Sequence, residues 1–273
     1  MNVIAELTLR DLGATVPGQL SRYSRALEVA CSTAPPPYGT RRYGEIYRSA
    51  ASDPAWIVES LITSAEREAD GAGRLWSLAA CTEDRGIADL VKQHAIDEAR
   101  HARWYIAVLD LVFPGAVDPA VRTHLDAVPP EYHHGMEARS VPDSPFAHPV
   151  TIDDLVQMNI AEIRTAVNQR LQRPVLLAYC DPSRRDKLTA LLDRLLHDEV
   201  RHVGYSAELI ERLSATDPAA LVELMLSRMR DFNEITCAEV EGLVFPLHCS
   251  REECRSSAVC SNTGRTDTPP QGR

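Results

Sequence analysis

The pentapeptide DEARH at residues 97–101 occurs again, with one substitution, as DEVRH at residues 198–202. Each copy contains Glu-x-x-His, and residues three apart on an α-helix project from the same face. Each copy therefore presents a carboxylate and an imidazole side by side. Two such helices facing each other can hold two metal ions, so the repeat predicts an internally duplicated, helical metal site.

Both copies lie on apolar stripes. In the segments 87–113 and 184–213, apolar residues recur at alternating intervals of three and four, as on a helix with one buried face. The stripes run through Ile87, Val91, His94, Glu98, His101 and Tyr105, and through Leu188, Leu192, Leu195, Glu199, His202 and Ser206. A charged glutamate on a buried stripe needs a partner, and a metal ion is a natural one.

The positions of proline and aspartate residues, which mark where helices start and end, predict an all-α fold. We expect helices over residues 53–81, 87–113, 151–180, 184–213 and 217–246. The stretch 114–150 is rich in Pro, His and charge and has no clear period, so we expect a long crossover there.

Three units follow from this division. Residues 1–52 are expected to form an irregular cap, residues 53–246 the helical domain, and residues 247–273 a disordered tail. The tail contains His248, Cys249, Cys254 and Cys260, whose spacing is wider than zinc sites favour, and an unstructured tail is the default interpretation.

A bundle site for two metals also needs one glutamate from each of the other two helices. In the helix 151–180, the choice is Glu162. In the helix 53–81, the candidates are Glu59, Glu66 and Glu68. Ala65-Glu66 is followed by Arg-Leu at the same offsets as Ala161-Glu162, so we predict Glu66 as the ligand and a solvated role for Glu68.

The resulting pattern is a glutamate followed, 32 or 37 residues later, by the glutamate of Asp-Glu-x-Arg-His. The whole unit occurs twice. Over about residues 55–213 it resembles the di-iron carboxylate oxygenases and desaturases of the ferritin-like superfamily. The resemblance implies a four-helix bundle with a long crossover between its second and third helices and extra flanking helices. It also implies six iron ligands: Glu66, Glu98, His101, Glu162, Glu199 and His202.

The resemblance gives the neighbouring motif residues a supporting role. Asp97 and Asp198 are expected to reach the histidine of the opposite half, and Arg100 and Arg201 to pair with these aspartates. The alternative is a solvated Asp–Arg pair within each helix. Ligating histidines usually donate their second N–H to a carboxylate, and both halves keep both residues, which favours the supporting role.

His94 breaks the symmetry of the two halves, because Leu195 stands at the equivalent position. Some arylamine N-oxygenases of the resembled superfamily have an extra histidine one turn before a motif glutamate, although in the second half. His94 is therefore either a seventh ligand or a core histidine bonded to a backbone carbonyl or carboxylate, and the sequence leaves both open.

Small and polar residues near the expected ligands suggest a substrate pocket. Ala69 and Gly73 follow Glu66 on its helix and leave space, although close helix packing explains them equally well. Asn159 and Thr165 flank Glu162, and Tyr105 lies one turn beyond His101. Each of these three could face a substrate or simply belong to the core.

Composition limits the classes of partner that we expect this protein to bind. The net charge is −10, with no basic stripe, which argues against nucleic acid. The N-terminus lacks a signal-like apolar run, no stretch approaches a membrane span, and we expect the seven cysteines to be reduced thiols of a cytoplasmic protein. The implied cofactors are two Fe ions, with Mn as an alternative, and O2 as co-substrate. A separate electron donor or reductase is implied, and a homodimer is left open.

The sequence thus favours an oxygen-dependent enzyme that acts on a small organic molecule by hydroxylation, N-oxygenation or desaturation. Three alternatives are a ferroxidase or iron-storage protein, a peroxide-reducing protein of the rubrerythrin kind, and a radical-generating subunit that would use Tyr105. None of the candidate site residues identifies the substrate.

Overall fold

The structure is a computed structural model that describes residues 2–16, 18–140 and 144–239. The described chain is a packed helical bundle without strands. Its helices are α1 (Val3–Thr15), α2 (Ser21–Thr33), α3 (Arg41–Ala50), α4 (Pro54–Cys81), α5 (Arg85–Val112), α6 (Pro119–Ala127), α7 (Ile152–Tyr179), α8 (Arg185–Leu213) and α9 (Pro218–Ala238), with short 3₁₀ turns η1 (Pro37–Gly39) and η2 (Pro182–Arg184).

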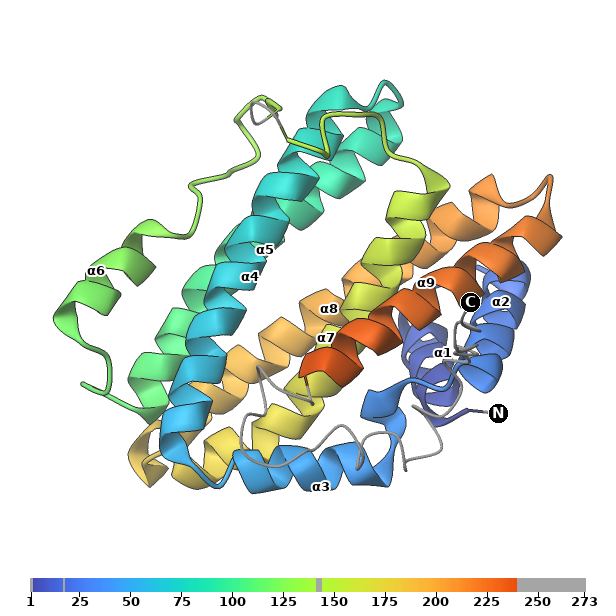
Figure 1. Ribbon diagram of the computed structural model, residues 1–273. Helices are drawn as coiled ribbons and strands as arrows, with labels where there is room; N and C mark the ends of the chain where they lie inside the picture. The colour runs from blue at the N-terminus through green and yellow to red at the C-terminus, as the bar shows by residue number, and fades with distance from the viewer. Residues whose placement is uncertain (1, 17, 141–143, 240–273) are drawn as a thin grey trace, which may run out of the picture.

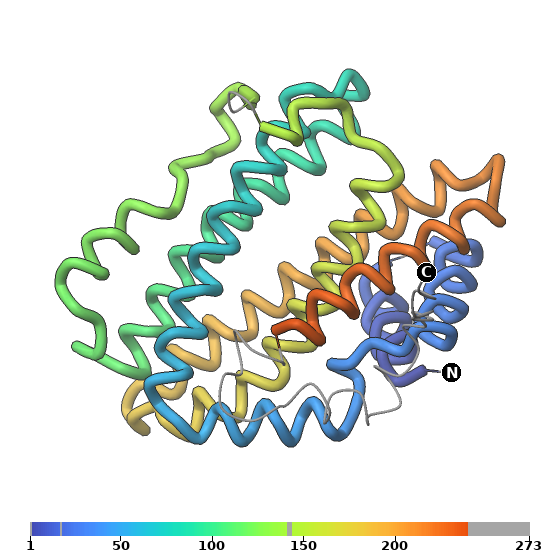
Figure 2. Tube along the Cα trace, in the orientation of Figure 1, coloured from blue at the N-terminus to red at the C-terminus, as the bar shows by residue number. Residues whose placement is uncertain are grey.

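Four long helices, α4, α5, α7 and α8, form the centre of the molecule. Figures 1 and 2 show α4 antiparallel to α5 and α7 antiparallel to α8, with the two pairs packed through α5 and α8. The starts of α4, α5 and α7 follow from capping side chains, because Asp53, Asp84 and Thr151 each accept a hydrogen bond from a backbone N–H of the first turn. The expected boundaries of these four helices agree with the structure to within two residues.

A crossover connects α5 to α7, which run in the same direction (Figure 2). It contains α6, a short helix that the sequence analysis did not foresee, because residues 114–150 showed no clear period. Tyr132 stacks on Trp76 of α4 at 4.1 Å between ring centroids. Arg103 and Lys92 of α5 donate to crossover carbonyls, so the described part of the connection is fastened to the α4–α5 pair.

The expectation of an irregular cap at residues 1–52 is wrong. Three helices form there, and α2 buries Tyr23, Ala26, Leu27, Ala30 and Cys31 at the spacing of one helical face. Most of these side chains are small or polar, which weakened the hydrophobic signal. In Figure 1, α2 lies against α9, and α3 crosses near one end of α7.

A buried polar network fastens the N-terminal helices to the central ones. The Tyr23 hydroxyl donates to Asn159 Oδ1 at 2.8 Å, and Glu211 of α8 accepts from the Tyr23 backbone N–H. Asn159 also donates to the Val203 carbonyl and to Ser206. Because every polar atom of the Asn159 side chain is paired, the residue joins three helices rather than facing a pocket.

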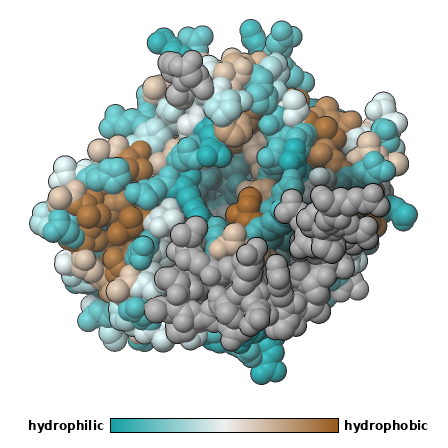
Figure 3. All heavy atoms as spheres, viewed as in Figure 1, coloured by the Kyte–Doolittle hydropathy of each residue, from teal (hydrophilic) through white to brown (hydrophobic). Residues whose placement is uncertain are grey.

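The surface in Figure 3 is hollowed near the middle of the face shown, and hydrophilic residues border the hollow. Among the described residues, no helix is long and apolar enough to cross a membrane. Cys31, Cys81 and Cys180 are free thiols. The expected tail at 247–273 and its cysteines lie outside the described residues, as does the expected end of the fifth helix near residue 246.

Candidate metal centre

Two groups of ligand-type side chains meet in the core between α4, α5, α7 and α8. One group is Glu68, His101 and Glu199, and the other is His94, Glu98, Glu162 and His202. All seven residues are buried, and within each group the potential ligand atoms lie within 4.8 Å of one another. The helical stripes described above bring the two halves of the chain face to face here.

Glu66 is not part of this cluster, and its prediction as a ligand is corrected. Its side chain is 46% exposed and faces His124 of α6, with 3.3 Å between Oε1 and Nε2. Glu68, expected to be solvated, is buried instead, with Oε2 3.8 Å from His101 Nδ1. Two residues turn a helix by roughly 200°, so only one of the two glutamates can face the core.

A sequence signal could have identified Glu68. The buried stripe of α4 runs through Leu61, Ala65, Glu68, Ala72 and Leu75, at intervals of three and four. Glu66 lies off this stripe. The local Ala-Glu and Arg-Leu matches between the two halves pointed to a position that the helical period excludes.

The other five predicted ligands converge on shared carboxylates. Glu98 Oε1 lies 3.3 Å from His101 Nδ1 and 3.5 Å from His202 Nδ1. Glu199 Oε1 lies 3.4 Å from His101 Nδ1, and Glu199 Oε2 lies 3.6 Å from His202 Nδ1. Glu98 and Glu199 therefore each lie within 3.6 Å of both histidines.

His94 belongs to the same centre. Its Nε2 lies 3.3 Å from Glu162 Oε1 and 3.4 Å from Glu98 Oε1. Its ring centroid lies 3.7 Å from that of His202, with the two rings tilted by 31°. Its Nδ1 is hydrogen-bonded to the Tyr205 hydroxyl at 2.8 Å. The partner of its second nitrogen is thus a tyrosine, and Nε2 is left facing the carboxylates.

Several atoms at the centre of the cluster are buried without a hydrogen bond. They are His94 Nε2, His101 Nδ1, His202 Nδ1, Glu98 Oε1 and Glu199 Oε2. Buried polar atoms are rarely left unpaired, because desolvation without a partner is costly. Imidazole nitrogens and carboxylates are ligand types that divalent transition-metal ions accept, so each of the two groups could hold a metal ion.

The aspartates of the two motifs brace the histidines across the halves. His101 Nε2 lies 3.2 Å from Asp198 Oδ2, and His202 Nε2 lies 3.4 Å from Asp97 Oδ2. Since an ionised carboxylate can only accept, each histidine donates from Nε2. When such a ring is neutral, the lone pair of Nδ1 faces the cluster.

The motif arginines complete this frame. Arg100 donates to Asp97 and to Asp198, and Arg201 does the same. Burial alone would raise the pKa of Asp97 and Asp198, but hydrogen bonds hold each pKa well below its usual range. Asp97 accepts from His202, Gln93 and Arg201, and Asp198 accepts from His101 and both arginines. Both aspartates are therefore ionised.

Gln169 of α7 was missed by the sequence analysis. Its Nε2 donates to Glu199 Oε1 at 2.7 Å and to the Tyr105 hydroxyl at 3.3 Å. It lies seven residues after Glu162, on the same buried stripe, which is the signal that could have identified it. Gln169 fixes the orientation of Glu199 and links Tyr105 to the centre.

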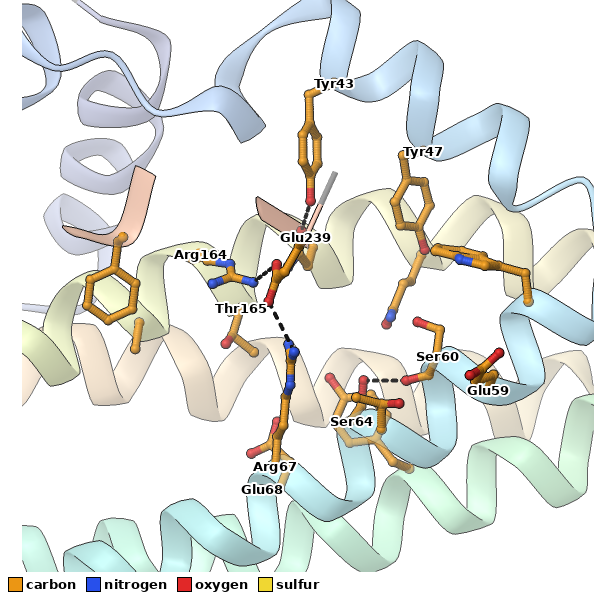
Figure 4. Close-up of a pocket in the computed structure, with 17 residues that line it drawn as sticks. Tyr43, Tyr47, Glu59, Ser60, Ser64, Arg67, Glu68, Arg164, Thr165 and Glu239 are labelled. Atoms are coloured by element: carbon orange, nitrogen blue, oxygen red, sulfur yellow. Dashed lines mark hydrogen bonds and ion pairs between the residues drawn. The ribbon is translucent and has the colours of Figure 1, made fainter. Parts of the chain in front are cut away.

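A cavity of about 260 Å³ adjoins the cluster (Figure 4). Of the residues predicted to line a pocket, Thr165 and Tyr105 do so, and Glu68 forms part of the same wall. Ala69, Gly73 and Asn159 are not among its lining residues. Asn159 is occupied by the network described above, and the Cα of Gly73 faces open space.

No protein-family model matches the chain, and no curated protein or solved structure matches it significantly.

Proposed function

We propose that the protein is a ferritin-like di-iron oxidoreductase that uses O2 to oxidise a small organic molecule. The observation that carries the proposal is the pair of buried ligand groups, with Glu98 and Glu199 between His101 and His202. Support also comes from the chain path, because two antiparallel helix pairs joined by one long crossover are typical of ferritin-like folds.

Charge supports a dinuclear centre. Glu68, Glu98, Glu162 and Glu199 carry four negative charges when ionised, and two divalent ions would balance them. Glu68 and His101 would hold one ion, while His94, Glu162 and His202 would hold the other. Bound there, ferrous ions would supply the electrons that begin the reduction of dioxygen.

The protein residues around the centre position ligands and exclude water. Asp198 and Asp97 keep the Nδ1 atoms of His101 and His202 directed inward, and Gln169 holds Glu199. For His94 to present the lone pair of Nε2, its Nδ1 must carry the proton and donate it to Tyr205. Burial of all seven candidate ligands keeps bulk solvent away from the reacting centre.

The cavity favours an enzyme over an iron-storage protein. It is large enough for a small organic molecule, and Glu68 belongs both to the ligand cluster and to the cavity wall. A substrate there would therefore lie beside the metals. In a hydroxylation, one oxygen atom of O2 enters the substrate and the other leaves as water, which requires two electrons from a separate reductase and two protons.

Anaerobic titration with Fe(II), followed by exposure to O2, tests the proposal. We expect about two irons per chain and oxygen uptake that depends on the iron. Glu199→Ala should abolish both, whereas Glu66→Gln, on the exposed face of α4, should change neither. Stoichiometric binding of two ions without oxygen uptake would contradict the oxidase function, and no iron binding would contradict the metal centre itself.

A further inference from the structure

Two arginines share one carboxylate at the side of the cavity. Arg67 Nη2 lies 3.0 Å from Glu239 Oε1, and Arg164 donates to Glu239 Oε2. Figure 4 shows Arg67 rising from α4 and Arg164 extending from α7 to meet at Glu239. Arg164 and Glu239 are largely buried, with side chains 12% and 13% exposed. All three residues line the cavity.

The charges of this group do not balance. Two guanidinium groups face one carboxylate, so this group of three side chains carries one formal positive charge. Glu59, the other acidic residue of the wall apart from Glu68, is exposed. A guanidinium pair that already binds a carboxylate has the geometry to bind another one, because carboxylates and arginines form directed, charge-assisted hydrogen bonds.

The remaining wall combines aromatic side chains with polar ones such as Ser60 and Gln172. Tyr43, Tyr47, Trp56 and Phe232 contribute to it, and Tyr47 meets Trp56 edge to face at 5.5 Å between ring centroids. Aromatic walls favour a flat or apolar ligand body. The cavity of about 260 Å³ corresponds to roughly nine water-sized volumes of about 30 Å³ each, which is enough for a small organic molecule.

We infer that this cavity binds a small organic carboxylate. Its carboxylate group pairs with Arg67 and Arg164, in competition with Glu239, and its apolar body lies against the aromatic wall. The opposite end of the ligand then lies toward Glu68 and Tyr105, beside the candidate metal centre. The identity of this ligand as a substrate rests on the proposed function, whereas its binding does not.

Isothermal titration of the full-length protein with octanoate and 3-phenylpropanoate tests the inference. We expect at least one of them to bind, and the neutral amide of the same acid to bind at least tenfold more weakly, since a hydrogen bond to a charged group contributes that much. Equal affinity for an acid and its amide, or no binding of either acid, would overturn the inference.

A matched pair of variants locates the site. Arg67→Gln should weaken carboxylate binding at least tenfold, and Arg74→Gln should change it less than about twofold, because an exposed pair outside the cavity contributes little. Arg67 and Arg74 share α4, have side chains 57% and 53% exposed, and each pairs with a carboxylate, but only Arg67 lines the cavity. Equal effects of the two substitutions on carboxylate binding would contradict the assignment of the binding site to this cavity.

Glu239→Gln removes the competing carboxylate and should tighten acid binding; weaker binding would contradict the competition. Iron content and oxygen uptake of the same preparations separate the two proposals. Normal iron binding and oxygen uptake without preference for an acid over its amide contradict only the carboxylate site. Selective acid binding without iron contradicts only the di-iron function.

Discussion

Glu66 and Glu68 are two residues apart on α4 and have opposite environments: the Glu68 carboxylate lies beside His101 in the core, and the Glu66 carboxylate lies beside His124 at the surface. Because both are glutamates on one helix, they form a matched pair in which helix propensity and charge are constant. A comparison of substitutions at the two positions therefore isolates the effect of helical phase on metal binding.

Glu68→Gln is expected to lower iron content from about two ions per chain toward one, because the group with His101 and Glu199 loses a carboxylate ligand. Glu66→Gln should retain full iron content. Metal analysis after anaerobic loading and gel filtration measures both. Iron loss in Glu66→Gln with full content in Glu68→Gln would contradict the arrangement of α4.

His94→Leu tests the asymmetry between the halves, since Leu195 is the natural counterpart. We expect iron affinity at the group with Glu162 and His202 to fall by at least about tenfold, because a nitrogen ligand is lost. The visible spectrum of the oxidised protein should change as well. Unchanged iron content and spectrum would remove His94 from the ligand set.

Asp198→Asn is expected to weaken metal binding about 10- to 100-fold, because His101 loses the charged acceptor that orients it. Competition with a chromophoric chelator measures the affinity. Asp193→Asn is the control, since Asp193 also lies on α8 and pairs with an arginine, Arg173, but its side chain is 58% exposed. Equal losses in the two variants would indicate that α8 is perturbed as a whole.

Metal affinity is expected to fall as pH falls. Burial and the neighbouring Glu98 raise the pKa of Glu68, and burial also raises the pKa of Glu199. Despite burial, the adjacent Glu199 and Asp198 carboxylates raise the pKa of His101. Groups with raised pKa values retain their protons to higher pH in the metal-free protein, and metal binding must release them.

The measurement is proton release in weakly buffered solution, together with Mn(II) affinity between about pH 6 and about pH 8. The slope of log affinity against pH should equal the number of protons released. A flat profile without proton release would show that the ligands are already deprotonated in the metal-free protein.

Asn159→Ala is expected to reduce the free energy of unfolding by about 1–3 kcal/mol, because buried partners on α2 and α8 lose their hydrogen bonds. Iron content should be unaffected. Asn168→Ala, on the same helix but partly exposed, should cost less. Urea denaturation compares them, and loss of iron without loss of stability in Asn159→Ala would place Asn159 in the functional site.

The sequence by itself predicted the long helices and much of the centre. The repeat at 97–101 and 198–202 and the apolar stripes around it are local properties, and helical period alone places Glu98, His101, Glu199 and His202 on inner faces. The cross-braced contacts between His101 and Asp198, and between His202 and Asp97, are present as the resemblance to di-iron proteins implied.

The tertiary structure decided what depends on phase and on distant neighbours. A rotation of roughly 200° separates Glu66 from Glu68 on α4, and the packing of α4 on α5 buries the side that carries Glu68, as the apolar stripe of α4 indicates. Whether His94 joined the cluster depended on Glu162 of α7 and Tyr205 of α8, which no local pattern connects to it. The meeting of Arg67, Arg164 and Glu239 likewise required three helices to pack together, because residues so far apart in sequence become neighbours only in the folded chain.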